Sequence, residues 1–179
     1  YGLIEVGVLR SKSKSSESLW VKVGGDGFET RVVNDMLEIK ADSAMLGYLN
    51  APSPFTEDGW FMTGDAVEVD GEYVKILGRK SEMINVGGEK VYPAEVESVI
   101  MGMDNIVDVT VYKEKNTIIG NIICAKVMID KDEEPNILIQ KLKDYCRSLL
   151  KPYKVPIKIE IVKEKQYGSR FKKKRNHNG

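Results

Sequence analysis

The sequence is poor in the residues that build metal centres and disulfide frameworks. It contains two cysteines and one histidine among 179 residues. Cys124 and Cys146 lie in apolar or helical stretches, with no Cys-x-x-Cys spacing and no neighbouring histidine. This pattern argues against a zinc site or a disulfide, and it predicts two buried thiols in a reducing compartment. The single histidine, His177, lies in the terminal stretch and is assigned no role.

Net charge and long apolar runs are also absent. Lysine plus arginine and aspartate plus glutamate number 27 each, so the formal charge is +0. No overall electrostatic field therefore favours nucleic acid or an anionic membrane. No apolar run approaches the length of a membrane span, and no secretory signal is visible. These observations predict a cytoplasmic protein that binds neither nucleic acid nor a membrane.

The remaining composition is typical of a globular chain, with 42% hydrophobic and 30% charged residues. A chain of 179 residues can form one or two small domains and bury a core. It opens at Tyr1, without an initiator methionine and already inside a motif-like stretch. This opening suggests a fragment of something longer.

The most informative stretch covers residues 60–96. An Asp-Gly step at 70–71 separates two alternating apolar runs, which is the strongest short-range signal for a β-hairpin. Asp65 ends a Thr-Gly-Asp turn before this hairpin, and Arg79 follows it. The hairpin would bring Asp65 and Arg79 close together. Taken alone, such a pair is either part of a site or a surface salt bridge.

This stretch resembles core motifs of the adenylate-forming enzymes, which include acyl-CoA synthetases, adenylation domains of peptide synthetases, and luciferases. Their Thr-Gly-Asp motif, which follows aromatic residues, is matched by Thr63, Gly64 and Asp65. Their Gly-Arg motif is followed by a hinge residue, a short strand, a glycine-rich turn and an acidic helix, and residues 78–97 match this order. Several motifs in the right order make the resemblance specific. With motifs at both ends, it covers nearly the whole chain.

The resemblance implies that Thr63, Asp65 and Arg79 bind the nucleotide. A carboxylate oriented by a tight turn, as Asp65 would be, can accept hydrogen bonds from ribose hydroxyls. The Arg79 guanidinium would make a charge-assisted contact with the same sugar or with a phosphate. ATP and AMP are therefore the expected nucleotides.

A further motif of the family, aromatic-Gly-x-Thr-Glu, is matched by residues 1–5, with Ile4 in place of the threonine. The resemblance implies that Glu5 helps to hold the Mg²⁺ that accompanies ATP. Magnesium takes hard oxygen ligands and shares them with phosphates, so a glutamate is chemically suitable. Ile4 lacks the hydroxyl with which the family's threonine contacts a phosphate or the substrate carboxylate.

The resemblance implies that two features after Arg79, namely Lys80 and the glycine pair at 87–88, take part in a rotation of the C-terminal domain. Lys80 occupies the family's hinge position, although an ordinary exposed lysine in a turn would look the same. Gly87 and Gly88 would let the pantetheine arm of CoA pass close to the backbone, because glycine has no Cβ to obstruct it. The glycine pair is also what a two-residue hairpin turn requires, and both interpretations can hold together.

The basic tail resembles the family's last motif, Gly-Lys-x-x-Arg. The lysine of that motif contacts the acyl carboxylate and the α-phosphate, where a fixed ammonium stabilises the transition state. Lys172 is the best match because Arg175 follows it at the right spacing, and Lys173 is one position away. The alternative is a solvated basic tail that touches nucleic acid.

The order of expected elements predicts an α+β fold. Short strands before residue 80 predict a small antiparallel, barrel-like subdomain, and the apolar run 44–49 is expected mainly to pack in its core. Strands and helices alternate afterwards, which predicts a compact α/β domain with a mixed sheet flanked by helices. We expect residues 1–79 to end a large N-terminal domain, and residues 80–179 to form a mobile C-terminal domain.

The resulting hypothesis is the C-terminal fragment of an AMP-forming acid:CoA ligase. Such an enzyme activates a carboxylic acid with Mg-ATP and passes the acyl group to CoA, and the fragment alone would be inactive. Its partners would be the acid, CoA or a carrier protein, and the missing N-terminal domain. Two alternatives stay open: a carrier-dependent adenylation domain, and a non-catalytic interaction module, which Ile4 and the altered tail motif would favour.

Overall fold

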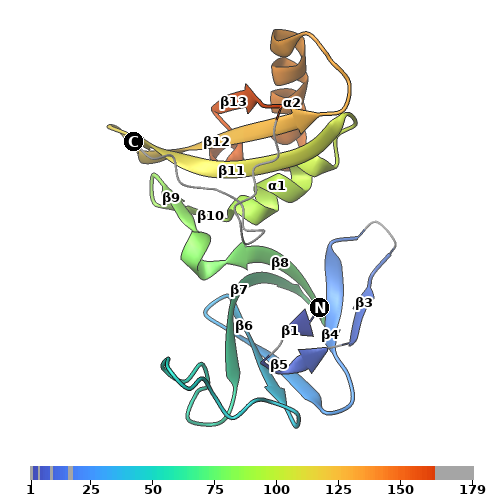
Figure 1. Cartoon of the computed structure of the whole chain (residues 1–179), viewed down its shortest axis with the longest axis vertical. Coiled ribbons are helices and arrows are strands. Elements are labelled where there is room, and N and C mark those ends of the chain that lie inside the picture. Colours follow the sequence, from blue (N-terminus) through green and yellow to red (C-terminus); the bar gives the residue numbers. More distant parts are fainter. Residues whose placement is uncertain (1, 4, 9, 16–17, 164–179) are drawn as a thin grey trace. The chain divides into compact units, whose positions relative to one another are not determined.

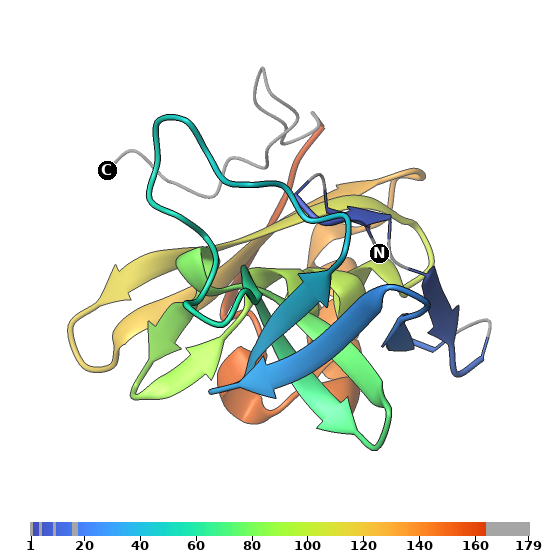
Figure 2. The same ribbon diagram turned by 90° about the horizontal axis from the view of Figure 1, so that it is seen from below.

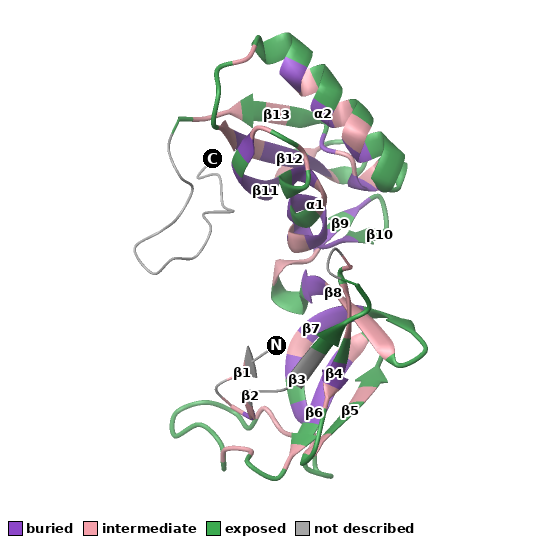
Figure 3. Ribbon diagram, turned by 90° about the vertical axis from the view of Figure 1, so that its right-hand side faces the viewer, coloured by how far each residue is buried: buried purple, intermediate pink, exposed green. Residues whose placement is uncertain are grey.

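The computed structural model describes residues 2–3, 5–8, 10–15 and 18–163. The chain divides into two compact units, Tyr1–Ser81 and Glu82–Gly179. The boundary expected from the sequence, between residues 79 and 80, lies beside this division. Each unit has a hydrophobic core of its own, visible as the purple segments inside the ribbon in Figure 3.

The first unit is built on a six-stranded sheet with the strand order β3-β4-β8-β7-β6-β5, in which every pair is antiparallel. A small pair, β1 with β2, precedes it (Figure 1). The strands are β1 (Gly2–Leu3), β2 (Gly7–Val8), β3 (Arg10–Ser13), β4 (Trp20–Gly24), β5 (Phe28–Val33), β6 (Met36–Ala41), β7 (Phe61–Asp70) and β8 (Tyr73–Arg79). These pairings establish the predicted antiparallel subdomain, while its closure into a barrel remains a prediction.

The expected Asp-Gly hairpin joins β7 to β8. Asp70 pairs with Tyr73, so the chain reverses through two residues. Gly71 lies in this turn with φ of 59°, a conformation that glycine adopts at little cost. Phe61 and Val67 of β7 belong to the core of the first unit, and Val74 and Ile76 of β8 pack against it. The other core residues are Val6, Val23, Leu37 and Ile39.

The second unit contains a mixed sheet with the strand order β11-β12-β13 and two helices. The β11–β12 pair is antiparallel and the β12–β13 pair is parallel, which confirms the predicted mixed sheet. A two-stranded hairpin of β9 and β10 precedes the sheet. The elements are β9 (Ile84–Val86), β10 (Glu89–Val91), α1 (Pro93–Met101), β11 (Ile106–Asn116), β12 (Gly120–Ile129), α2 (Pro135–Leu149) and β13 (Lys158–Ile161).

Both helices bury residues in one core with the sheet. Alternate residues of a strand share one face, and Val109, Val111, Ile123, Ala125 and Val127 form that face here. The helices contribute Val96 and Ile100 from α1 and Leu142 and Cys146 from α2 to the same cluster. None of the helices in the described part of the chain combines the length and the apolarity of a membrane span.

Helix α2 begins and ends where local chemistry predicts. Pro135 occupies its first turn, and the Glu134 carboxylate accepts a hydrogen bond from the Ile137 backbone N–H at 2.8 Å. The helix ends at Leu149, shortly before Pro152, because the residue preceding a proline is pushed out of the helical conformation.

Helix α1 begins at Pro93, and its acids are buried rather than solvated. The Glu95 carboxylate binds the Lys154 ammonium at 2.8 Å and 2.6 Å through its two oxygens. The side chains of this pair are only 7% and 10% exposed. Glu97 accepts a hydrogen bond from the backbone N–H of Val111 at 2.8 Å. These carboxylates therefore tie α1 to other elements of the unit.

Replacing Lys154 by methionine should strongly destabilise the chain. The Glu95 carboxylate would remain buried without its cation, which typically costs about 3–5 kcal/mol. Replacing both partners, with Lys154→Met and Glu95→Leu, should recover much of that loss, because no charge is left buried. Equilibrium urea unfolding of the two variants beside the wild type measures the difference. A single variant as stable as the wild type would contradict this view of the ion pair.

The two thiols should react slowly in the native chain. Cys124 and Cys146 are free and buried, as the sequence predicted, and burial raises the pKa of each to about 11. At about pH 8 the thiolate fraction is therefore small, and alkylation by iodoacetamide should be much slower than in urea. Mass spectrometry of labelled peptides follows both sites, and rapid labelling of either one in the native chain would contradict the burial.

Candidate functional site

The Thr-Gly-Asp segment, which the sequence predicted to be a turn, lies inside strand β7, where the pairing with β6 shifts register. Hydrogen bonds of the Thr63 side chain fix this segment. The Thr63 hydroxyl donates to the Leu37 carbonyl at 2.7 Å and accepts from the Asp65 backbone N–H at 3.0 Å. Gly64 adopts φ of 73°, which most side chains disfavour. Thr63 and Asp65 are both buried. The structure therefore gives the Thr63 side chain a positioning contact with the backbone of Leu37 and of Asp65.

Asp65 and Arg79 are paired across β7 and β8, as the hairpin predicted. The Arg79 Nε lies 2.8 Å from the Asp65 Oδ1, and the Nη1 group donates to the Thr63 carbonyl at 3.0 Å. One guanidinium thus binds both the Asp65 carboxylate and the backbone of the Thr-Gly-Asp segment. The side chain of Asp65 is 7% exposed and that of Arg79 is 52% exposed, so this is not a pair between two solvated residues.

Glu5 lies in the electrostatic field of the same arginine. The Tyr48 hydroxyl donates to the Glu5 Oε1 at 2.6 Å. This hydrogen bond, the Glu5 backbone N–H and the positive charge of Arg79 hold the pKa of Glu5 below its ordinary value. The carboxylate is therefore ionised at neutral pH. The charge of Arg79 thus acts on Glu5 as well as on Asp65, and the sequence motifs assigned all three residues to the nucleotide and its metal.

The expectation that segment 44–49 mainly packs in the core was wrong for most of its length. Ala44 and Met45 pack against the core of the first unit, but Leu46 and Leu49 are fully exposed and Tyr48 is half-exposed. The segment forms a loop rather than a strand, so its apolar residues have no sheet face to join. Within the segment, the one sign against a purely apolar packing role was the Tyr48 hydroxyl, a polar group that can form a hydrogen bond across a loop.

Gly87 and Gly88 form the turn between β9 and β10. Val86 pairs with Glu89, so the two glycines are the whole loop, and they adopt φ of 59° and 95°. Two successive positive φ values are typical of the tight hairpin turns that glycine favours. The Gly88 N–H donates to the Asn85 Oδ1 at 2.9 Å. Both glycines are exposed. The hairpin turn is present, and the contact with pantetheine remains a prediction.

The remaining predicted positions are less defined by contacts. Lys80 is exposed and begins a 3₁₀ turn, Lys80–Glu82, directly after β8. This is a place where a chain can change direction, and the hinge itself stays a prediction. Ile4, Lys172 and Lys173 lie outside the described residues.

A magnesium ion bound by the described residues would have to take part of its coordination shell from a bound nucleotide and from water. In the described part of the chain, no group of three or more histidine, cysteine, aspartate or glutamate residues is placed to hold a metal ion. Magnesium usually takes one or two protein carboxylates and completes its octahedral shell with phosphate and water. A single ionised carboxylate such as Glu5 fits this mode of binding.

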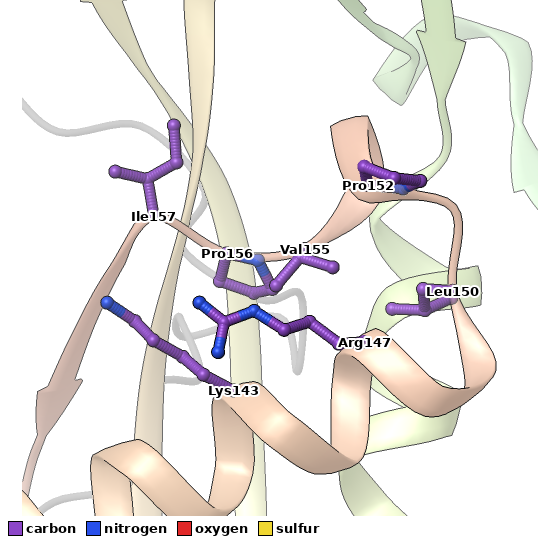
Figure 4. A pocket seen from close by; sticks show the side chains of 7 residues that line it. All are labelled: Lys143, Arg147, Leu150, Pro152, Val155, Pro156 and Ile157. Carbon is purple, nitrogen blue, oxygen red and sulfur yellow. The ribbon is translucent and has the colours of Figure 1, made fainter.

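The second unit has a pocket whose lining includes none of the predicted site residues. The pocket, of about 500 Å³, lies between α2 and the segment that follows it, and Figure 4 shows its lining. Lys143 and Arg147 project from α2 over an apolar lining that includes Val155 and Pro156. Arg147 forms an ion pair with Asp144 at 2.7 Å. We assign this pocket no part in the site.

The comparison with known proteins gives the family. Residues 95–175 match the family model of the AMP-binding enzyme C-terminal domain. A long-chain-fatty-acid–CoA ligase from Mycobacterium tuberculosis is 37% identical over 140 residues, which are 76% of this chain and 27% of that protein. A 2-succinylbenzoate–CoA ligase from Enterococcus faecalis is 36% identical over 124 residues, 68% of this chain and 25% of that protein. This chain therefore spans about a quarter of these curated relatives.

A solved structure shows the same fold. The o-succinylbenzoate CoA synthetase from Bacillus subtilis, in complex with its acyl-adenylate intermediate, matches with a TM-score of 0.74 and 26% identity. The match covers 86% of this chain and 34% of that chain. Together with the motifs, these findings confirm the resemblance to the adenylate-forming, AMP-binding enzymes, and residues 95–175 match the C-terminal domain of that family.

The Thr63 hydroxyl should matter for stability apart from any activity. Thr63→Val keeps the shape of the side chain but leaves the buried Leu37 carbonyl and the Asp65 N–H without this partner. We expect a loss of about 1–3 kcal/mol in the free energy of unfolding. Thr63→Ser keeps the hydroxyl and should lose less, about 1 kcal/mol for the missing methyl group. Urea denaturation compares the two, and equal stability of the valine variant and the wild type would exclude this role.

Proposed function

We propose that this chain is the C-terminal part of an AMP-forming acid:CoA ligase. In this reaction a carboxylate oxygen attacks the α-phosphorus of ATP and pyrophosphate leaves. The thiolate of CoA then attacks the acyl carbon, and AMP leaves. The observation that carries the proposal is the ion pair of Asp65 and Arg79, with Glu5 in the field of the same arginine, in a chain whose relatives are named as CoA ligases.

Asp65 and Arg79 are the proposed nucleotide contacts. A carboxylate has about four acceptor sites, so one that is bound to an arginine can also accept hydrogen bonds from sugar hydroxyls. The Asp65 carboxylate is paired with the Arg79 guanidinium, and the Thr63 hydroxyl binds the Asp65 backbone N–H. The half-exposed guanidinium of Arg79 would meet the ribose or a phosphate, where charge-assisted hydrogen bonds are strong.

Glu5 is the proposed protein ligand of magnesium. When bound with ATP, the ion neutralises part of the phosphate charge. The hydrogen bond from Tyr48 supports this role in two ways, because it fixes one carboxylate oxygen and favours the ionised form. Tyr48 would therefore act as a positioning residue for Glu5.

Lys172 or Lys173 is the proposed catalytic lysine. Negative charge concentrates on the oxygens around the α-phosphorus as the carboxylate attacks. An ammonium held at that point stabilises the transition state more than the ground state, which raises the rate rather than only the affinity. The spacing to Arg175 favours Lys172 over Lys173.

The second reaction step is proposed to use a rotation of the C-terminal domain about Lys80. We assign residues 1–79 to the large N-terminal domain and residues 80–179 to the mobile domain, and the division of the chain into two compact units supports this assignment. The exposed glycine turn at 87–88 would then lie against the pantetheine arm. CoA is favoured over a carrier protein because the relatives reported above are named as CoA ligases.

The missing N-terminal domain is a proposed partner, since the curated relatives are much longer than this chain. The acyl pocket would belong to that part, and the isolated chain would be inactive. The test is acid-dependent pyrophosphate release by the full-length protein with acetate, octanoate, palmitate, benzoate and 2-succinylbenzoate. Release with at least one acid is expected, and ATP binding without release from any acid of a broad panel would overturn the proposal.

Asp65→Asn in the full-length protein should lower acid-dependent pyrophosphate release roughly 10- to 100-fold, because a charge-assisted hydrogen bond is lost. Asp70→Asn is the matched control: Asp70 lies at the other end of β7, is exposed, and binds Lys14 at 2.9 Å. Circular dichroism would confirm that both variants fold. Equal activity of Asp65→Asn and the control would rule out a contact between Asp65 and the nucleotide.

Lys172→Ala and Lys173→Ala, measured in the same assay, decide which lysine is catalytic. Loss of adenylation by about 100-fold or more is expected in Lys172→Ala alone. Loss in Lys173→Ala alone would move the assignment by one position. If neither variant changed the rate, the tail would have no catalytic lysine at this motif.

A further inference from the structure

The glycine turn at 87–88 is held from outside by a second hairpin. The tip between β11 and β12 lies beside β9, and Figure 2 shows the yellow-orange hairpin next to the smaller green one. The Gly87 N–H donates to the Ile119 carbonyl at 3.0 Å. The Asn121 side-chain amide donates to the Asn85 carbonyl at 2.7 Å. Both bonds connect the turn to a segment more than thirty positions away.

The tip that provides these contacts is itself well ordered by hydrogen bonds. The Asn116 Oδ1 accepts from the backbone N–H groups of Ile118 and Ile119 at 2.9 Å and 3.2 Å. The Asn121 N–H donates to the Ile119 carbonyl at 3.0 Å. This carbonyl therefore receives two donors, one from the tip and one from the glycine turn. The tip presents its groups in a fixed arrangement.

These contacts remove the freedom that two adjacent glycines would otherwise have. Glycine loses more conformational entropy on ordering than any other residue, so an unsupported Gly-Gly turn samples many conformations. Here Asn85 binds Gly88 from within the hairpin, while Ile119 and Asn121 hold Gly87 and the Asn85 carbonyl from outside. Of these two outside contacts, the one from Asn121 is made by a side chain. It can therefore be removed by substitution without altering the backbone.

We propose that Asn121 is a positioning residue for the acceptor step. This inference rests on the proposed function, in which the glycine turn lies along the pantetheine arm while the thiolate sulfur bonds to the acyl carbon and AMP leaves. Asn121 touches none of the reacting atoms. It acts through the turn, by keeping the backbone of residues 85–88 in the shape that lets the arm pass. Adenylation uses other residues, so it should not depend on Asn121.

Two substitutions isolate the donor group of this side chain. Asn121→Ala removes the amide. Asn121→Asp keeps its shape but replaces the donor by a carboxylate, which cannot donate to the Asn85 carbonyl and repels it. The matched control is Asn136→Ala, which removes an amide of the same kind from the exposed first turn of α2, where it donates to Glu134 at 3.2 Å. The tip and the glycine turn are untouched in the control.

The first measurement is hydrogen–deuterium exchange of the peptide that covers residues 84–91 in the full-length protein. Loss of one hydrogen bond should speed exchange of these amides about tenfold in both Asn121 variants and leave the control unchanged. The second measurement separates the half-reactions in the same proteins. Acid-dependent pyrophosphate release should stay within twofold of the wild type, whereas acyl-CoA formation at limiting CoA should fall about tenfold.

Each result decides the proposal. Unchanged exchange in both Asn121 variants would overturn the positioning role, whatever the activity. Faster exchange with an equal loss in both half-reactions would also overturn it, because the effect would then be general. If the wild type itself releases no pyrophosphate, the proposed function fails and the acceptor step falls with it; the exchange data would then show only whether Asn121 orders the turn. Faster exchange with a selective loss of acyl-CoA formation supports the proposal.

Discussion

The contact between Arg79 and the Thr-Gly-Asp segment of β7 is the interaction on which the candidate site depends. One guanidinium binds the Asp65 carboxylate and the Thr63 carbonyl, and its charge also favours an ionised Glu5. Arg79 is the last residue of β8, and Lys80 already belongs to the next turn. The ion pair of Asp65 and Arg79 therefore lies where the chain leaves the first unit. A small change in the backbone conformation after Arg79 would move the Arg79 guanidinium, and with it the contacts to Asp65 and Thr63.

Local turn chemistry made part of the structure predictable. The Asp-Gly step gave the hairpin, and the hairpin gave the register that pairs Asp65 with Arg79. The glycine pair at 87–88 was likewise correct as a tight turn, because few residues other than glycine adopt two successive positive φ values. The mixed sheet followed from the order of apolar stretches. In each case the decisive information lay within a short window of sequence.

Contacts between distant segments could not be predicted in this way. The bonds from Tyr48 to Glu5, from Lys154 to Glu95 and from Asn121 to Asn85 join residues 43, 59 and 36 positions apart. Each exists because packing brings two elements together, and a single sequence carries no signal for that approach. The acids of α1 are an example, since the helix dipole favours an acid near a helix start but does not specify which group binds it. Here both acids are buried and bind other parts of the second unit.

The inert thiols have a practical consequence. Since Cys124 and Cys146 are buried and their pKa values are raised to about 11, they would not compete with an accessible cysteine for a maleimide dye at neutral pH. One new surface cysteine on each unit could thus carry a donor and an acceptor fluorophore without removal of the native residues. The separation of the two units could then be followed in single molecules of this chain, with the packing around the native thiols unaltered.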